Sequence, residues 1–123
     1  EWLQLINFLG GDAVAGGALK SIGTLEDSDG LWHEPNFGAT NESGFTALPS
    51  GYRSFNDYTN IGYRTFYWTS TEIYDYAASS WRVDSGVAEI ANSYTNKQYG
   101  YSVRCLKDFD SSIMEHRTVP ISK

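Results

Sequence analysis

The start of the chain follows a helical pattern. Apolar residues recur at the spacing of three and four that places side chains on one helix face. They are Trp2, Leu5, Ile6 and Leu9. Gly10-Gly11 follows at once, as is typical of a helix C-terminus. The pattern therefore predicts an amphipathic helix over residues 1–9.

The pattern weakens after this helix. A short second helical turn is predicted between Asp12 and Lys20, although Gly16-Gly17 lowers the helical propensity there. Residues 21–44 are rich in Gly, Ser, Asp and Asn, which favours loop.

The second half of the chain has the pattern of a β-rich region. Short apolar or aromatic segments alternate with turn-forming residues at roughly ten-residue spacing, which indicates short antiparallel strands. The segments are 45–49, 51–55, 64–71, 79–84, 87–94 and 100–108. Helices first and strands later predict an α+β domain over residues 1–108, in which the helices cover part of a small sheet. Residues 109–123 show no such pattern and are expected to form a C-terminal tail.

Composition narrows the class of protein. The chain has 123 residues, enough for one hydrophobic core. Aromatic residues reach 15%, and Tyr and Trp favour both sheet cores and recognition surfaces. The net charge of -6, without a basic cluster, argues against a nucleic-acid partner. The sequence has no apolar run of 18 residues, so no direct membrane insertion is expected of this segment.

The sequence carries little catalytic chemistry. His33 and His116 each lack a second ligand at metal-binding spacing, so no zinc site is expected. The nucleophile and phosphate-loop motifs are also missing. We therefore expect a protein that is not an enzyme and that needs no cofactor.

Calcium is the alternative left open among cofactors. Its candidate oxygen ligands are Asp27, Asp29, Asn36, Asn41 and Glu42, although their spacing is not that of an EF-hand. The tripeptide Glu34-Pro35-Asn36 is identical to a sugar-binding signature of animal C-type lectins. The partner signature Trp-Asn-Asp is absent, and coincidence is the preferred interpretation.

Five blocks, taken in order, closely resemble a known family. They are EWLQLINFLGG, VAGGALK, GATNESGFTALPSGYR, YWTSTE and GYSVRCLKD. The family is the Fibrobacter succinogenes major paralogous domain, common in secreted and surface lipoproteins of Bacteroidetes and Fibrobacteres. The resemblance spans residues 1–108. It implies a C-type-lectin-like fold, with short helices packed on small antiparallel sheets with long loops.

The resemblance also assigns a group of scaffold residues. They are Asn41, Glu42, Ser43, Gly44, Phe45, Leu48, Pro49, Gly51, Tyr52, Arg53, Trp68, Ser70, Thr71, Glu72, Gly100, Ser102, Val103, Arg104 and Cys105. Glycine permits turns and proline fixes φ, which supports a structural role. We expect Arg53 or Arg104 to bind carboxylates such as Glu42 or Glu72.

The family domain normally begins earlier than this sequence. Only Glu1-Trp2 matches the end of a preceding segment similar to CPxGWHVPTDAEW, so we expect the start of the domain to be missing. By the resemblance, the cysteine of that segment pairs with Cys105. A disulfide implies an extracytoplasmic location, at the cell surface or secreted.

Residues 74–99 form the candidate recognition region. They combine flat aromatic faces with amide, hydroxyl and charged groups, the chemistry of sugar sites and paratopes. The candidate ligand-binding residues are Tyr74, Asp75, Tyr76, Trp81, Arg82, Asp84, Asn92, Tyr94, Asn96 and Tyr99. The leading hypothesis is a non-catalytic module that binds a glycan or protein ligand. Ordinary solvent-exposed strand positions would explain the same residues.

Other hypotheses fit the same sequence. The domain could be a structural or assembly module of a surface lipoprotein or filament, with the tyrosines buried between chains and a strand supplied by another chain. It could also be a variable protein of a diversity-generating retroelement. An enzyme related to the formylglycine-generating enzymes is disfavoured, because those need reactive cysteines and copper whereas this chain has one cysteine.

Overall fold

The structure is a computed structural model that describes residues 1–106. It begins with two helices, α1 (Trp2–Phe8) and α2 (Asp12–Leu19), and continues through a long loop region into strands. The first predicted helix is confirmed to within one residue at each end. The predicted tail, 109–123, and His116 lie outside the described residues. No helix within residues 1–106 has the length and apolar character needed to cross a membrane.

Helix α2 is a full helix where only a weak turn was predicted, and its glycine pair has a packing role. A Cβ on Gly16 would lie 2.6 Å from the carbonyl oxygen of Glu89, and one on Gly17 would lie 2.2 Å from that of Gly38. Only glycine permits such close contacts between backbones. The two glycines therefore lower helix propensity but let α2 lie directly on the loops beside it.

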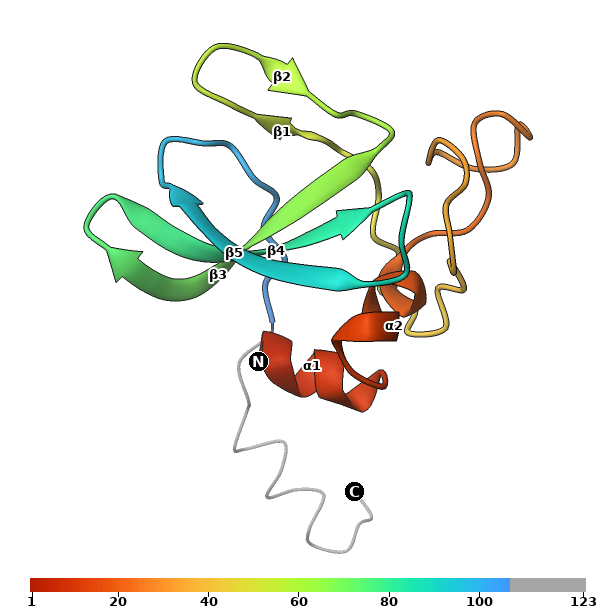
Figure 1. Cartoon of the computed structure of the whole chain (residues 1–123), viewed down its shortest axis with the longest axis horizontal. Helices are drawn as coiled ribbons and strands as arrows, with labels where there is room; N and C mark the ends of the chain where they lie inside the picture. The colour runs from red at the N-terminus through yellow and green to blue at the C-terminus, as the bar shows by residue number, and fades with distance from the viewer. Residues whose placement is uncertain (107–123) are drawn as a thin grey trace, which may run out of the picture.

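Two antiparallel sheets follow the loops. Strands β1 (Tyr52–Arg53) and β2 (Tyr58–Thr59) form a small hairpin. Strands β3 (Arg64–Tyr74), β4 (Ala77–Asp84) and β5 (Ile90–Asn96) form a sheet in the order β3-β4-β5. Figure 1 shows both helices on one side of this sheet and the small hairpin on the other. The chain is thus an α+β domain, as predicted.

Two predicted strands are wrong. Segment 45–49 makes a single parallel bridge, Lys20 with Ala47, and Thr46 has a φ of 58°, outside the range of a strand. Segment 100–108, as far as it is described, makes only isolated bridges. Ser102 donates its N–H to the carbonyl of Phe66 and accepts from the N–H of Trp68, at 2.9 and 3.0 Å. This segment therefore borders the outer edge of β3.

The core lies between the helices and one face of the larger sheet. Side chains alternate between the two faces of a strand, so Trp81 and Val83 point to the helices while Arg82 and Asp84 point away. The core cluster has 0–5% exposure. It consists of Ile6, Ala15, Leu19, Trp32, Ala47, Tyr67, Trp81, Val83 and Ile90. The buried Trp32 indole donates to Ser21 Oγ and to the carbonyl of Ala47, both at 3.1 Å.

A buried lysine joins three parts of the chain. Lys20 has 0% exposure, and its Nζ donates to the carbonyls of Phe37, Asp84 and Val87 at 2.8, 2.9 and 3.0 Å. These carbonyls satisfy all three N–H donors of the ammonium group. Burial lowers the pKa of Lys20 to about 8, and the negative charge of Asp84 opposes this shift.

Candidate functional site

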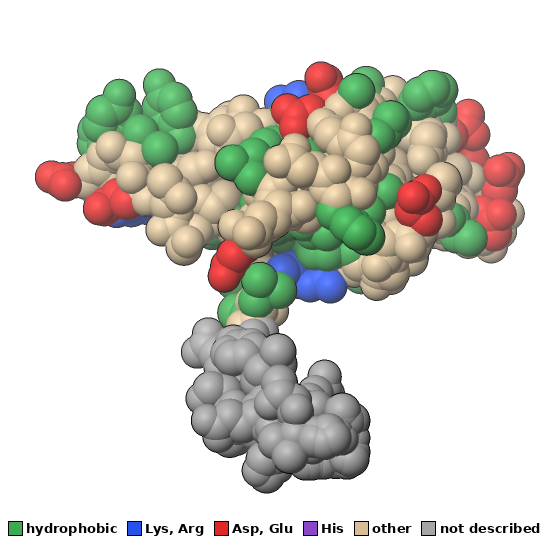
Figure 2. Space-filling model, turned by 90° about the horizontal axis from the view of Figure 1, so that it is seen from below, with side chains coloured by type: hydrophobic (Ala, Val, Ile, Leu, Met, Phe, Trp, Pro, Cys, Tyr) green, Lys and Arg blue, Asp and Glu red, His purple; other side chains and the backbone are tan. Residues whose placement is uncertain are grey.

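Three exposed tyrosines gather at the end of the β3–β4 hairpin. Tyr74 and Tyr76 stack with ring centroids 5.4 Å apart, and Tyr94 of β5 meets Tyr74 edge to face at 5.9 Å. Their exposed fractions are 49%, 63% and 59%. Figure 2 shows hydrophobic side chains projecting at the end of the molecule where this hairpin lies. We call these three residues the tyrosine cluster.

The strand register explains why these residues meet. Tyr74 lies opposite Ala77 across the turn, and Ser79 lies opposite Tyr94. Residues opposite each other in antiparallel strands share one face, so Tyr94, Ser79 and Trp81 all point to the helix side of the sheet. The tyrosine cluster is therefore continuous with the part of that face that borders the helices.

A groove of about 790 Å³ runs along this part of the sheet. Its lining includes tryptophan surface together with hydroxyl and amide groups. The lining residues that belong to the sheet are Trp68, Thr69, Ser70, Thr71, Ser79, Trp81 and Asn92. The helix end and the C-terminal segment close the other side, through residues that include Trp2, Asp12 and Arg104.

The polar groups in the groove are held in place. Asn92 is exposed, and its Nδ2 donates to Ser79 Oγ and to the carbonyl of Ser80 at 3.1 and 2.9 Å. Thr69 Oγ1 accepts from the N–H of Thr71 at 3.0 Å. Oriented hydroxyl and amide groups beside aromatic surface are the features that recognise sugar hydroxyls and C–H groups. Ser79 and Thr69 were not among the predicted residues, because a single Ser or Thr in a strand does not by itself indicate a binding site.

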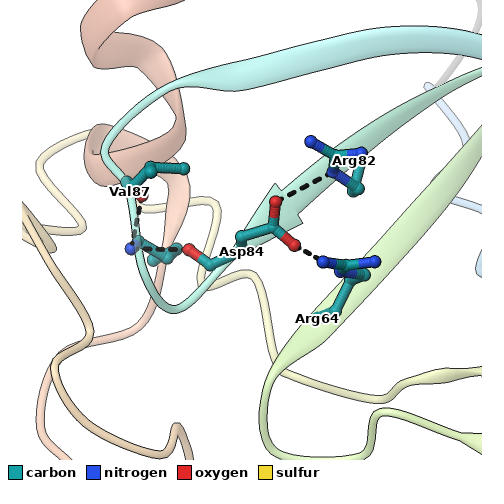
Figure 3. Close-up of polar contacts among 5 residues, drawn as sticks. Arg64, Arg82, Asp84 and Val87 are labelled. Carbon is teal, nitrogen blue, oxygen red and sulfur yellow. Dashed lines mark hydrogen bonds and ion pairs between the residues drawn. The ribbon is translucent and has the colours of Figure 1, made fainter.

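Two predicted ligand-binding residues lie on the opposite face of the sheet. Arg64 and Arg82 donate their Nε–H groups to the two carboxylate oxygens of Asp84, at 2.5 and 2.8 Å. Figure 3 shows Asp84 between the two arginines. Arg82 and Asp84 therefore form a structural ion-pair triad with Arg64, apart from the tyrosine cluster, and residues 74–99 do not share one recognition face.

The remaining predicted ligand-binding residues are dispersed. Trp81 is only 5% exposed and forms the floor of the groove. Asp75 is exposed in the hairpin turn, and Asn96 Oδ1 accepts from the N–H of Gln98 at 2.8 Å in the turn after β5. Tyr99 stacks on Tyr52 at 6.2 Å in a second aromatic group, around the small hairpin. The structure thus brings Tyr74, Tyr76 and Tyr94 together in the tyrosine cluster, and places Trp81 and Asn92 in the groove on the face that Tyr94 shares.

Several predicted scaffold residues order loops. Asn41 Oδ1 accepts from the N–H of Thr46 at 2.8 Å, and Glu42 accepts from Thr40 Oγ1 at 3.2 Å. Gly44 and Gly51 adopt φ values of 74° and 68°, which favour glycine.

Other predicted scaffold residues join segments that are distant in the sequence. The carbonyl of Pro49 accepts from the N–H of Gly62, and Gly100 pairs with Arg53. Trp68 packs on Tyr101 at 4.5 Å.

The predicted carboxylate partners of the arginines are wrong. Arg104 Nη2 donates to the carbonyl of Phe45 at 2.9 Å, and its guanidinium lies 3.8 Å from the Phe45 ring centre. Arg53 lies over the ring of Tyr58 at 4.9 Å. Glu72 instead pairs with Lys97. Arginine stacks on aromatic rings because its guanidinium is planar and weakly hydrated.

Other predicted features can also be located. Cys105 is exposed and is not in a disulfide. Within residues 1–106 there is no group of three His, Cys, Asp or Glu side chains that could hold a metal ion. Asp29 Oδ1 accepts from the N–H of Thr24, and Asn36 donates to the carbonyls of Ser21 and Gly23. The calcium hypothesis stays a prediction.

Comparison with known proteins identifies the family. No curated protein and no solved structure matches the chain. The model of the Fibrobacter succinogenes major domain matches residues 1–107, which include both helices, both sheets and the groove. The chain therefore belongs to the Fibrobacter succinogenes major domain family.

Proposed function

We propose that this domain is a non-catalytic recognition module that binds a glycan along the groove and the tyrosine cluster. The observation that carries the proposal is the tyrosine cluster itself, in which Tyr74 contacts both other rings while all three remain 49–63% exposed. Exposed aromatic groups of this kind mark interaction sites in soluble proteins. The C-type-lectin-like fold and the extracytoplasmic location implied by the family resemblance fit the same role.

The groove favours a glycan over an apolar ligand. Ser79, Asn92 and Thr71 place hydroxyl and amide groups beside the tryptophan floor. A sugar presents hydroxyl groups around its rim and C–H groups on its faces, so it can bind amides and aromatic rings together. The Glu72–Lys97 ion pair lies close to the tyrosine cluster and adds charged groups of both signs.

A glycan-array and pull-down screen, with calcium and with a chelator, tests the proposal. Binding is expected to fall at least about tenfold in Tyr74→Ala/Tyr94→Ala, since truncating an aromatic anchor costs more than roughly 1.4 kcal/mol. The matched control is Tyr58→Ala, which removes a tyrosine with 65% exposure from the small hairpin. Circular dichroism checks that each variant folds.

Two outcomes would count against this function. Equal loss in the Tyr58→Ala control would show that the tyrosine cluster is not the site. No glycan bound under any condition would favour the assembly hypothesis instead. Binding that is lost only with the chelator would support both the glycan site and the calcium hypothesis.

A further inference from the structure

Strand β5 has an open edge. It is the last strand in the order β3-β4-β5, whereas the outer edge of β3 is bordered by the segment around Ser102. Among residues 1–106, β5 forms its strand pairing with β4 alone. Antiparallel strands direct their backbone N–H and C=O groups alternately to either side, so half of those of β5 point away from β4. Asn92, Ser93 and Tyr94, in the middle of the strand, are exposed.

This edge lacks the usual protection against strand pairing. Natural edge strands carry charged residues, proline or bulges that prevent contact with another strand. The β5 sequence, IANSYTN, has no charged residue and no proline. Its register with β4 runs unbroken from Ala77↔Asn96 to Val83↔Ile90, whereas the β3–β4 pairing contains shifts. Helix α2 packs against β5, and the hydrogen bond that it makes here, from the N–H of Gly17 to the carbonyl of Ala88, lies before the strand begins.

We propose that two copies of this chain pair through β5, antiparallel, about a two-fold axis at Ser93. Ser93 is the central residue of the strand Ile90–Asn96. A two-fold axis perpendicular to the sheet keeps equivalent faces together, so Asn92 of each copy lies opposite Tyr94 of the other. The same register places Ile90 opposite Asn96.

The charged residues at the two ends of β5 favour this register. Glu89 and Lys97, immediately before and after β5, lie at equal distances from Ser93 along the chain. In the two-fold pairing, Glu89 of each copy therefore lies opposite Lys97 of the other, so the arrangement forms two pairs of opposite charge. A parallel pairing in register would instead place like charges together. The strand is thus complementary to itself, as an isologous interface requires.

The pairing has a consequence for ligand binding, although it does not depend on the proposed function. It joins two three-stranded sheets into one continuous sheet, with both grooves on the same face. Tyr94 of one copy then lies beside Asn92 of the other. A pair of sites held at a fixed separation favours repetitive, multivalent ligands over isolated ones.

Charge reversal tests the interface and its register together. The dimer dissociation constant of the full chain is measured by analytical ultracentrifugation at low salt. Glu89→Lys and Lys97→Glu should each weaken the dimer about tenfold, because each converts two attractive pairs into repulsive ones. The double variant, Glu89→Lys/Lys97→Glu, should recover wild-type affinity. Glu72→Gln, which removes only the pair that Lys97 makes within the chain, should leave the dimer unchanged.

Cross-linking provides a second test of the same axis. Ser93 lies opposite itself in the dimer, and facing residues of antiparallel strands have Cα atoms about 4.5–5.5 Å apart, within disulfide range. Ser93→Cys/Cys105→Ser should form a disulfide-linked dimer under mild oxidation much faster than Asn56→Cys/Cys105→Ser. A chain that stays monomeric at about millimolar concentration overturns the proposal. The proposal is also overturned if the charge reversals leave the dimer dissociation constant unchanged and Ser93→Cys cross-links no faster than Asn56→Cys.

Discussion

Replacing Lys20 with methionine would test what holds the loops to the sheet. Its ammonium group donates to three carbonyls from two parts of the chain, that of Phe37 in the loop region and those of Asp84 and Val87 at the end of β4 and in the turn after it. Lys20→Met keeps a flexible side chain of similar length but removes every donor. The three partly buried carbonyls would then lose the donor that they share in the native protein.

The expected cost follows from two opposing effects. Each carbonyl left without its donor costs about 1–3 kcal/mol, so three cost roughly 3–9 kcal/mol. Removing the buried charge offsets part of this cost. Lowering the pKa of Lys20 from 10.5 to about 8 corresponds to a penalty of about 3 kcal/mol on its charged form, and methionine does not have this penalty. We therefore expect Lys20→Met to lower the free energy of unfolding by about 3 kcal/mol.

The pH dependence gives an independent check. Between pH 8 and 10.5 the unfolded lysine is protonated while the folded one loses its proton, so the unfolded state binds more protons. The free energy of unfolding of the wild type should thus rise with pH in this window, by up to about 1.4 kcal/mol per pH unit. This contribution is complete above 10.5 and is lost as the pH falls through 8. Lys20→Met should lack it.

Urea unfolding followed by tryptophan fluorescence measures both effects, since Trp32 lies 5.6 Å from Lys20 Nζ. The free energy of unfolding is measured at about pH 7 and at several values between about pH 8 and 9. The matched control is Lys97→Met, which removes an exposed lysine and should change stability by less than about 1 kcal/mol. A Lys20→Met variant as stable as this control, or one with the wild-type pH slope, would refute the reasoning.

Two further predictions concern the helix packing and the loop at His33. Gly17→Ala should lower the free energy of unfolding by about 3 kcal/mol or more, because the added Cβ would collide with the Gly38 carbonyl. The control is Gly86→Ala, whose added Cβ would have no atom within 4 Å. In the same urea assay it should stay within about 0.5 kcal/mol of wild type. The hydrogen bond from His33 lowers the pKa of Glu26. His33→Phe should raise that pKa toward 4.5 in a carboxyl NMR titration, and an unchanged value would assign the shift to the N–H of Glu34.

Patterns that reflect local physics were predictable from the sequence. The helix over residues 1–9 follows from side-chain periodicity, and the strands 64–71 and 79–84 follow from short apolar or aromatic segments bounded by turn-forming residues. Both patterns lie within the segment itself. The family resemblance also held, because it rests on several blocks in order along residues 1–107. The two wrong strand predictions occurred where hydrogen bonding to another segment decides whether a strand forms. Segment 100–106 is apolar enough for a strand but meets β3 only around Ser102.

The candidate site was only partly predictable, because residue type does not reveal which face a side chain occupies. Tyr74, Tyr76 and Tyr94 meet because a turn and a cross-strand register bring them together. Arg82 and Asp84 lie in the same sequence region but face the other side of the sheet, where they bind each other. Lys20 gave no signal, since a single lysine between a helix and a loop looks like a surface residue.

The position of the groove follows from the unequal lengths of helices and strands. A seven-residue helix such as α1 is about 10 Å long and eight residues of α2 span about 12 Å, whereas the eleven residues of β3 extend about 36 Å. The helices therefore cover only part of the sheet face. Beyond the helices the same face of the sheet is exposed to water. Its side chains there are Ser79, Asn92 and Tyr94 instead of apolar core residues. An uncovered sheet face with these side chains stays soluble while offering aromatic and hydrogen-bonding groups to a ligand.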